Sequence, residues 1–170
     1  MLESLITSKT RIRILVKFFT NVAATVHLRG LAEEMNESTN SIRKELNNLS
    51  EAGYLEKKAN QNRVTYKANV KHPLFATLQK IVFQHLGLDA VVELILARMG
   101  DVKQIVVLGD YAKGIDSGII EVLVVGEALN AGYIDQLALK IEGEIKRKVV
   151  FSLQGFRATE GLVIYEDFTI

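Results

Sequence analysis

The spacing of the apolar residues changes partway along this 170-residue chain. In much of the first half they recur every three or four residues, as they do along one face of a helix. Further on, Gln104–Leu108 and Ile119–Val125 form almost continuous apolar runs, which are typical of buried strands. Because a chain of this length has room for two small domains, we predict an α+β protein that is mainly helical at first and α/β afterwards.

The first 72 residues predict a specific order of elements. Ser8 is placed to cap a helix that runs to about Asn21, with apolar residues at helical spacing. The elements predicted after it are a strand at 25–28, a helix at 31–35, a polar turn at 36–38, a helix at 39–52 and two strands at 55–58 and 63–68 around a loop at 59–62. Helix, strand, helix, turn, helix and hairpin is the order of a winged helix-turn-helix.

The region after residue 72 predicts two helices and then a small α/β domain. Pro73 suits the first position of a helix that ends at Gly87, and Asp89 is placed to cap a second helix that Gly100 closes. The later elements are strands at 104–108, 119–125, 149–153 and 162–165, a glycine-bearing loop at 109–118 and a helix at 134–148. We therefore predict a DNA-binding domain at 1–72, linker helices at 73–100 and a second domain at 101–170.

The charges are divided unevenly between the two halves. Residues 1–72 carry twelve Lys and Arg against seven Asp and Glu, a net charge of +5, whereas residues 73–170 carry nine against thirteen, a net charge of −4. A basic half joined to an acidic half suggests that one end meets a polyanion, although a mixed surface can show the same imbalance by chance.

Composition also narrows the classes of protein. The absence of cysteine excludes disulfides, cysteine nucleophiles and thiolate metal sites, and it fits the cytoplasm. The histidines have no zinc-ligand spacing, and we expect no cofactor. No apolar run is long enough to span a bilayer, and the first residues do not resemble a secretory signal, so no membrane contact is expected.

The helix at 39–52 has one apolar and one polar side. Ile42, Leu46 and Leu49 form the predicted buried stripe, and Ser38 is the predicted N-cap. Amide and long basic side chains lie opposite, where they can reach phosphates and base edges of a major groove. The residues predicted to contact DNA from this helix are Ser38, Thr39, Asn40, Ser41, Arg43, Lys44 and Asn47. An ordinary amphipathic helix with a solvated face is the alternative.

The predicted hairpin adds positive charge to the same region. Basic residues flank a tip of small and amide residues, an arrangement that suits contact with phosphates or a minor groove. The residues predicted to contact DNA from the hairpin are Lys57, Lys58, Asn60, Gln61, Asn62 and Arg63. Tyr66 is expected to pack in the core instead.

These segments carry a resemblance to known regulators. The runs Leu31–Asn36 and Ile42–Leu55, with Ser38 between them, resemble the helix-turn-helix of ArsR- and MarR-type regulators. A narrower group, in which an ArsR-like winged helix is fused to a small nucleotidyltransferase-like domain, is similar at Ser8–Leu15, Asn62–Asn69, His72–Phe75 and Gly87–Leu88. The resemblance covers about residues 5–126. It implies that 58–63 is the wing and that the residues facing the major groove are Thr39, Asn40, Ser41, Arg43, Lys44 and Asn47. It implies no ArsR metal-sensing site, because the cysteines are absent.

The segment from the 104–108 strand to the 119–125 strand resembles the nucleotidyltransferase signature, which implies a mixed sheet. In that signature a Gly-Ser pair holds nucleotide phosphates, and two aspartates at i and i+2 on a strand bind divalent metals. Here Asp110 replaces the serine, and Ile119 and Glu121 replace the aspartates. No third carboxylate stands in 149–153, where Ser152 is the polar residue. The degenerate nucleotide-loop positions are Gly109, Asp110, Lys113, Gly114 and Glu121.

We therefore expect a DNA-binding transcriptional regulator that is not an enzyme. Its partners would be double-stranded DNA and a second copy of itself, since operators are commonly palindromic. The second domain would serve dimerisation or the sensing of a small-molecule or protein effector. The apolar stripe Leu74, Leu78, Ile81 and Val82 would pair with a second copy or pack within its own subunit. The alternatives are an active metal-dependent nucleotidyltransferase and a winged helix that binds protein.

Overall fold

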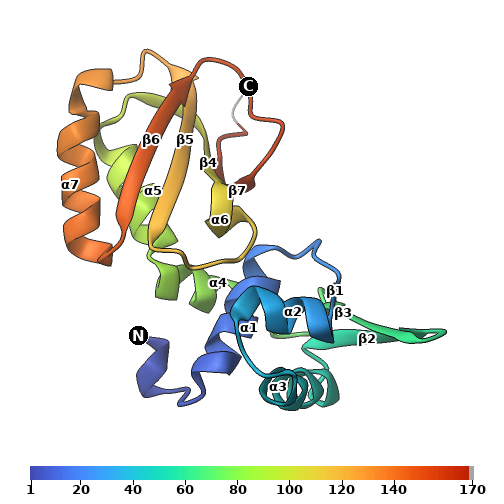
Figure 1. Ribbon diagram of the computed structural model, residues 1–170. Coiled ribbons are helices and arrows are strands. Elements are labelled where there is room, and N and C mark those ends of the chain that lie inside the picture. Colours follow the sequence, from blue (N-terminus) through green and yellow to red (C-terminus); the bar gives the residue numbers. More distant parts are fainter. Residues whose placement is uncertain (169–170) are drawn as a thin grey trace. The chain divides into compact units, whose positions relative to one another are not determined.

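The computed structural model describes residues 1–168 and confirms the α+β class (Figure 1). The chain divides into two compact units, Met1–Val82 and Phe83–Ile170, and the division falls within helix α4, Phe75–Leu86. Each unit has its own sheet, one of three strands and one of four. No helix in residues 1–168 is long and apolar enough to cross a membrane.

The first unit combines three α-helices with a small antiparallel sheet. Its elements are the 3-10 helix η1 (Leu2–Ser4), α1 (Lys9–Thr20), β1 (Val26–His27), α2 (Leu28–Met35), α3 (Thr39–Glu51), β2 (Leu55–Asn60) and β3 (Arg63–Ala68). The Ser8 hydroxyl accepts a hydrogen bond from the Arg11 N–H, as predicted for a cap of α1. The prediction that α2 begins at Leu31 was wrong. The helix starts at Leu28, directly after a strand of two residues.

Helix α3 is oriented by the apolar stripe that its sequence predicts. Ile42, Leu46 and Leu49 are all buried, and α3 packs against α1 and α2. The Ser38 hydroxyl accepts a hydrogen bond from the Ser41 N–H at 3.2 Å, which confirms Ser38 as the N-cap. Gly53, with φ at +81°, follows the helix in a left-handed conformation that glycine adopts without steric cost.

The three strands of this unit lie in the order β1-β3-β2, and the β2–β3 hairpin extends as a long ribbon (Figure 1). The predicted loop at 59–62 was too long, because Ala59 pairs with Val64 and Asn60 pairs with Arg63. Only Gln61 and Asn62 remain in the turn, where Gln61 has a φ of +51°. Such a two-residue turn matches the twist of an antiparallel hairpin.

Two predictions about the helices after the hairpin were wrong at their starts. Pro73 lies before α4, which begins at Phe75. Helix α5 (Leu88–Arg98) has Gly87 at its N-cap, so Asp89 is a first-turn residue and not the cap. A carboxylate in the first turn still faces the positive end of the helix dipole, which explains why the residue is favourable there. Of the apolar stripe predicted for this helix, Leu74 lies before α4 and is exposed, whereas Val82 is buried. The stripe is therefore not one free surface.

The second unit is a mixed four-stranded sheet with helices. Its further elements are β4 (Asp101–Leu108), α6 (Gly109–Ala112), β5 (Ile119–Glu127), the 3-10 helix η2 (Ala131–Tyr133), α7 (Ile134–Ile145), β6 (Lys148–Gln154) and β7 (Leu162–Glu166). The strand order is β6-β5-β4-β7, with β5 and β6 parallel and the other neighbours antiparallel. Helix α7 connects the parallel pair and ends at Ile145, three residues earlier than predicted.

The two faces of this sheet are covered differently. Ile120, Val122 and Val124 of β5 are buried on the face where α5 and α7 pack. On the other face, Val106, Leu123 and Val125 form a smaller apolar cluster with Leu108 and Ala158. Ala158 belongs to the segment 155–161 between β6 and β7, and its N–H donates to the Gln104 side chain at 3.1 Å. This segment therefore covers part of the second face in place of a helix.

Candidate functional site

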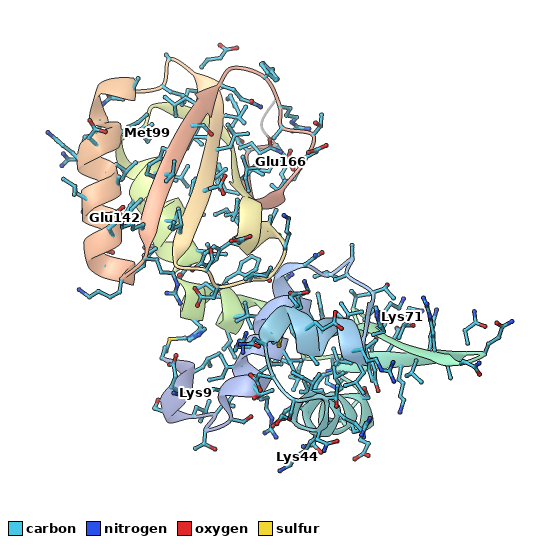
Figure 2. All side chains as sticks on the ribbon, in the orientation of Figure 1. Lys9, Lys44, Lys71, Met99, Glu142 and Glu166 are labelled. Carbon is cyan, nitrogen blue, oxygen red and sulfur yellow. The ribbon has the colours of Figure 1, made fainter. Side chains whose placement is uncertain are left out.

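The outward side of α3 is polar and basic. Thr39, Asn40, Ser41, Arg43 and Lys44 are all exposed, Ser38 is exposed beside them, and Asn47 is half-buried. Lys44 projects from the end-on coil of α3 in Figure 2. Arg43 donates to the Asn40 side-chain oxygen at 3.2 Å, a contact along one turn of the exposed face. The residues predicted for this face are thus brought together on one side of one helix.

The hairpin presents its cations on two different faces. Since residues paired across antiparallel strands share a face, Lys58 lies with Thr65 and Lys57 lies with Tyr66. Tyr66 is buried, as predicted for a packing residue, and the Lys57 ammonium lies 5.8 Å from its ring centre. Lys58 and Arg63 are exposed. The predicted wing residues therefore do not form one surface.

Three of the four cations of α1 are engaged within the unit, whereas Lys9, at the start of the helix, makes no ion pair in residues 1–168. Arg11 pairs with Glu45 at 2.7 Å, Arg13 with Glu37 at 2.8 Å and Lys17 with Glu34 at 2.7 Å. Each of these acceptors lies in α2, α3 or the turn between them. The ion pairs fix α1 to both helices and use three of the twelve positive charges of the first 72 residues.

The cations of α3 and of the hairpin tip are placed differently. Within residues 1–168 no ion pair involves Arg43, Lys44, Lys57, Lys58 or Arg63. Their charges are directed to solvent and are not neutralised by neighbouring carboxylates. The net charge of the sequence conceals this sorting, because it counts paired and unpaired cations alike.

Arg29 is a basic residue of this region that the sequence reasoning missed. It lies in the first turn of α2 and lines two grooves, of about 410 Å³ toward the start of α3 and about 590 Å³ toward Arg63 and Asn62 of the hairpin. Like the cations of α3, it makes no ion pair in the described part of the chain. The predicted start of α2 at Leu31 left Arg29 outside any element and hid this position.

In the second unit, the loop predicted at 109–118 is held by its own contacts and includes the single-turn helix α6. The fully buried Tyr111 donates its hydroxyl hydrogen to Asp116 and accepts the Gly118 N–H at 3.1 Å. Arg147, between α7 and β6, donates to both oxygens of Asp116 at 2.9 and 2.7 Å. A carboxylate engaged in this way is not available to a metal ion.

The electrostatics of this cluster follow from burial and from the two partners of Asp116. Burial and the neighbouring carboxylate raise the pKa of Tyr111 to about 12. Burial opposes ionisation of Asp116, but the hydrogen bonds from Arg147 and Tyr111 outweigh it and hold its pKa below the ordinary value. At neutral pH the cluster is therefore a carboxylate between a neutral phenol and a guanidinium.

The positions predicted from the resemblance to be a degenerate nucleotide loop show little room for a phosphate. Gly109 has a φ of +61°, and the Glu121 carboxylate lies directly over it, where a side chain at Gly109 would overlap it. Asp110, Lys113 and Glu121 are exposed, whereas Gly114 is buried. In residues 1–168 no group of three or more His, Cys, Asp or Glu side chains is placed to hold a metal ion.

Comparisons with models of protein families, with curated proteins and with solved structures found no match to this chain.

Proposed function

We propose that the protein is a DNA-binding transcriptional regulator whose first unit is a winged helix. Helix α3 would be inserted into the major groove, with Asn40, Arg43, Lys44 and Asn47 toward base edges and phosphates. The tip of the β2–β3 hairpin would follow the backbone beside it. The second unit would serve dimerisation or effector sensing.

The proposal rests on one observation, namely which cations of the first unit are paired with carboxylates and which are not. A protein that uses its charge for internal stability pairs its cations with carboxylates, as Arg11, Arg13 and Lys17 of α1 are paired. Unpaired cations on one helix face and at one hairpin tip leave charge that phosphates can neutralise, with release of counterions from the DNA. Arg29, in the grooves between α2 and these two elements, adds a third point for a phosphate contact.

The experiment is a titration of duplex DNA across a salt series. One duplex carries the region upstream of the protein's own gene and the other is a random sequence of the same length. We expect log affinity to fall linearly with log salt. We expect a preference for the upstream duplex on the order of 10³-fold.

Variants distinguish the effect of the proposed phosphate contacts from the effect of net charge alone. Lys44→Ala and Arg63→Ala should each reduce the salt slope by about 1, because each loses one phosphate contact. Arg13→Ala is the matched control: it removes the same charge, but its guanidinium is bonded to Glu37, so the slope should be unchanged. Weak binding to both duplexes at low salt would contradict the proposal. Unchanged affinity in Lys44→Ala and Arg63→Ala would favour a surface that binds protein.

A further inference from the structure

Strand β6 is an end strand of the second unit's sheet, so within residues 1–168 one of its two edges has no neighbouring strand. The Lys148 N–H donates to the Gly118 carbonyl at 2.9 Å, toward β5. Backbone groups of successive residues in a strand point to opposite sides. The N–H and C=O groups of Val149, Phe151 and Leu153 therefore point to the open edge.

One of these three outward N–H groups already has a partner. Glu142 of α7 accepts a hydrogen bond from the Val149 N–H at 2.9 Å, and Figure 2 shows this glutamate on the helix beside β6. In the described part of the chain, no side chain or loop takes a hydrogen bond from the N–H of Phe151 or Leu153. The open part of the edge is thus limited to these two residues.

Apart from the Glu142 contact at Val149, this edge lacks the devices that usually prevent strand pairing. It contains no proline, its register with β5 is unbroken from Ile119 to Val125, and the residues from Val149 to Leu153 are uncharged. Proteins blunt free edges with prolines, bulges or charges. Strand β7, at the opposite end of the sheet, has a register shift against β4 and is flanked by ion pairs of Glu166 and Asp167. The difference marks β6 as the edge suited to pairing.

We propose that β6 pairs with β6 of a second copy of this chain, antiparallel and across a two-fold axis at Ser152. A hydrogen-bonded pair in an antiparallel ladder joins two outward-pointing residues. Setting Phe151 opposite the Leu153 of the other copy uses the two open residues of each chain. Setting Phe151 opposite itself would instead require Val149, whose N–H is held by Glu142. In this register, the open N–H and C=O groups of Phe151 and Leu153 in one copy can therefore pair with the same groups of the other copy.

The surroundings of this axis fit a second copy. Val150 is 56% exposed on the open face of the sheet next to Ser152. Leu139, 71% exposed, lies one turn before Glu142 on α7, on the side of the helix that reaches β6. Pairing would bring these apolar side chains toward the partner, and no like charges would stand opposite one another near the axis. The pairing does not depend on the proposed DNA binding.

The test uses the full-length protein without DNA. The chain has no cysteine, so Ser152→Cys introduces a single thiol. Residue 152 would oppose its own copy in a non-hydrogen-bonded pair with Cα atoms about 4.5 Å apart, which lies within the range of a disulfide. Mild oxidation should convert most of this variant into a covalent dimer. Ser117→Cys, also at an exposed position but off the axis, should stay uncrosslinked.

Sedimentation velocity provides the second readout. The unmodified protein should sediment as a dimer, and Ser152→Lys, which sets two ammonium groups opposite each other at an exposed position, should sediment as a folded monomer. A monomeric unmodified protein would overturn the proposal. So would a dimer that Ser152→Cys does not crosslink or that Ser152→Lys does not dissociate. DNA titration of the monomeric Ser152→Lys remains a separate test of the proposed function.

Discussion

Glu45 shows how a single charged residue can belong to the buried side of an amphipathic helix. It lies on the inner face of α3 and is 6% exposed, between the apolar residues that orient the helix. Its carboxylate accepts hydrogen bonds from the Ser8 hydroxyl at 2.8 Å and from Arg11 at 2.7 Å. A buried carboxylate without such partners would carry a desolvation cost. The Ser8 that caps α1 therefore also fixes α3.

We expect Arg11→Ala to destabilise the fold much more than Arg13→Ala. The first substitution leaves the buried Glu45 carboxylate without its cation and should cost about 1–3 kcal/mol. The second breaks an ion pair whose arginine is 47% exposed, which should cost less than about 1 kcal/mol. Chemical denaturation of both variants measures the difference. Equal losses would mean that Glu45 is well solvated without Arg11.

At the scale of elements, two glycines of the second unit have different effects. One allows close packing, and the other only lowers the stability of a helix. Gly126, near the end of β5, is buried, and a methyl group there would overlap the backbone carbonyl of Asp101. Gly143, within α7, is exposed and has no neighbour that a methyl group would meet. The first glycine allows two strands to approach, whereas the second only weakens a helix.

We expect opposite effects from alanine at these two positions. Gly126→Ala should destabilise the second unit by about 2 kcal/mol or more, because rigid backbone must move. Gly143→Ala should stabilise it by roughly 0.5–1 kcal/mol, the helix preference of alanine over glycine. Thermal unfolding of the two variants gives the comparison. A loss of stability in Gly143→Ala would reveal a contact that requires the glycine, such as a close approach by another molecule.

At the scale of the whole molecule, the distribution of charge matters more than its total. The net charge of +1 combines a basic first half and an acidic second half. Within the first half, three cations of α1 are paired with carboxylates, whereas in residues 1–168 the cations of α3 and the hairpin tip are not. In the second unit, Arg147 is paired with Asp116, and Glu121 occupies the space over Gly109. The proposed DNA surface and the proposed loss of nucleotide chemistry both rest on these placements.

We expect Mg²⁺ or Mn²⁺ together with a nucleoside triphosphate to leave the melting temperature unchanged. A ligand that binds the native state must stabilise it, by about 2.7 kcal/mol at a hundredfold excess over its Kd. Each metal alone and triphosphate alone serve as controls. A rise that requires both would favour the nucleotidyltransferase alternative.

Much of the fold could be predicted because it follows from local patterns. The stripe of Ile42, Leu46 and Leu49, the caps at Ser8 and Ser38 and the apolar runs of β4 and β5 depend on residues close in the chain. Element ends were less predictable. Asn60 lies in a strand because it pairs with Arg63, although its residue type favours a turn. Likewise, no local sequence signal indicates that α2 begins at Leu28.

The sequence alone determined the α+β class, the order of most elements and the basic character of the first half, since periodicity and composition act through neighbouring residues. Tertiary structure decided which charges remain unpaired. Arg11 and Arg43 look alike in the sequence, yet the carboxylate of Glu45 pairs with the first, and no carboxylate in residues 1–168 pairs with the second. It also decided that β6 and β7 end the sheet, and that β6 is the end strand whose register is unbroken. Both outcomes depend on residues distant in the chain, whose meeting no local pattern encodes.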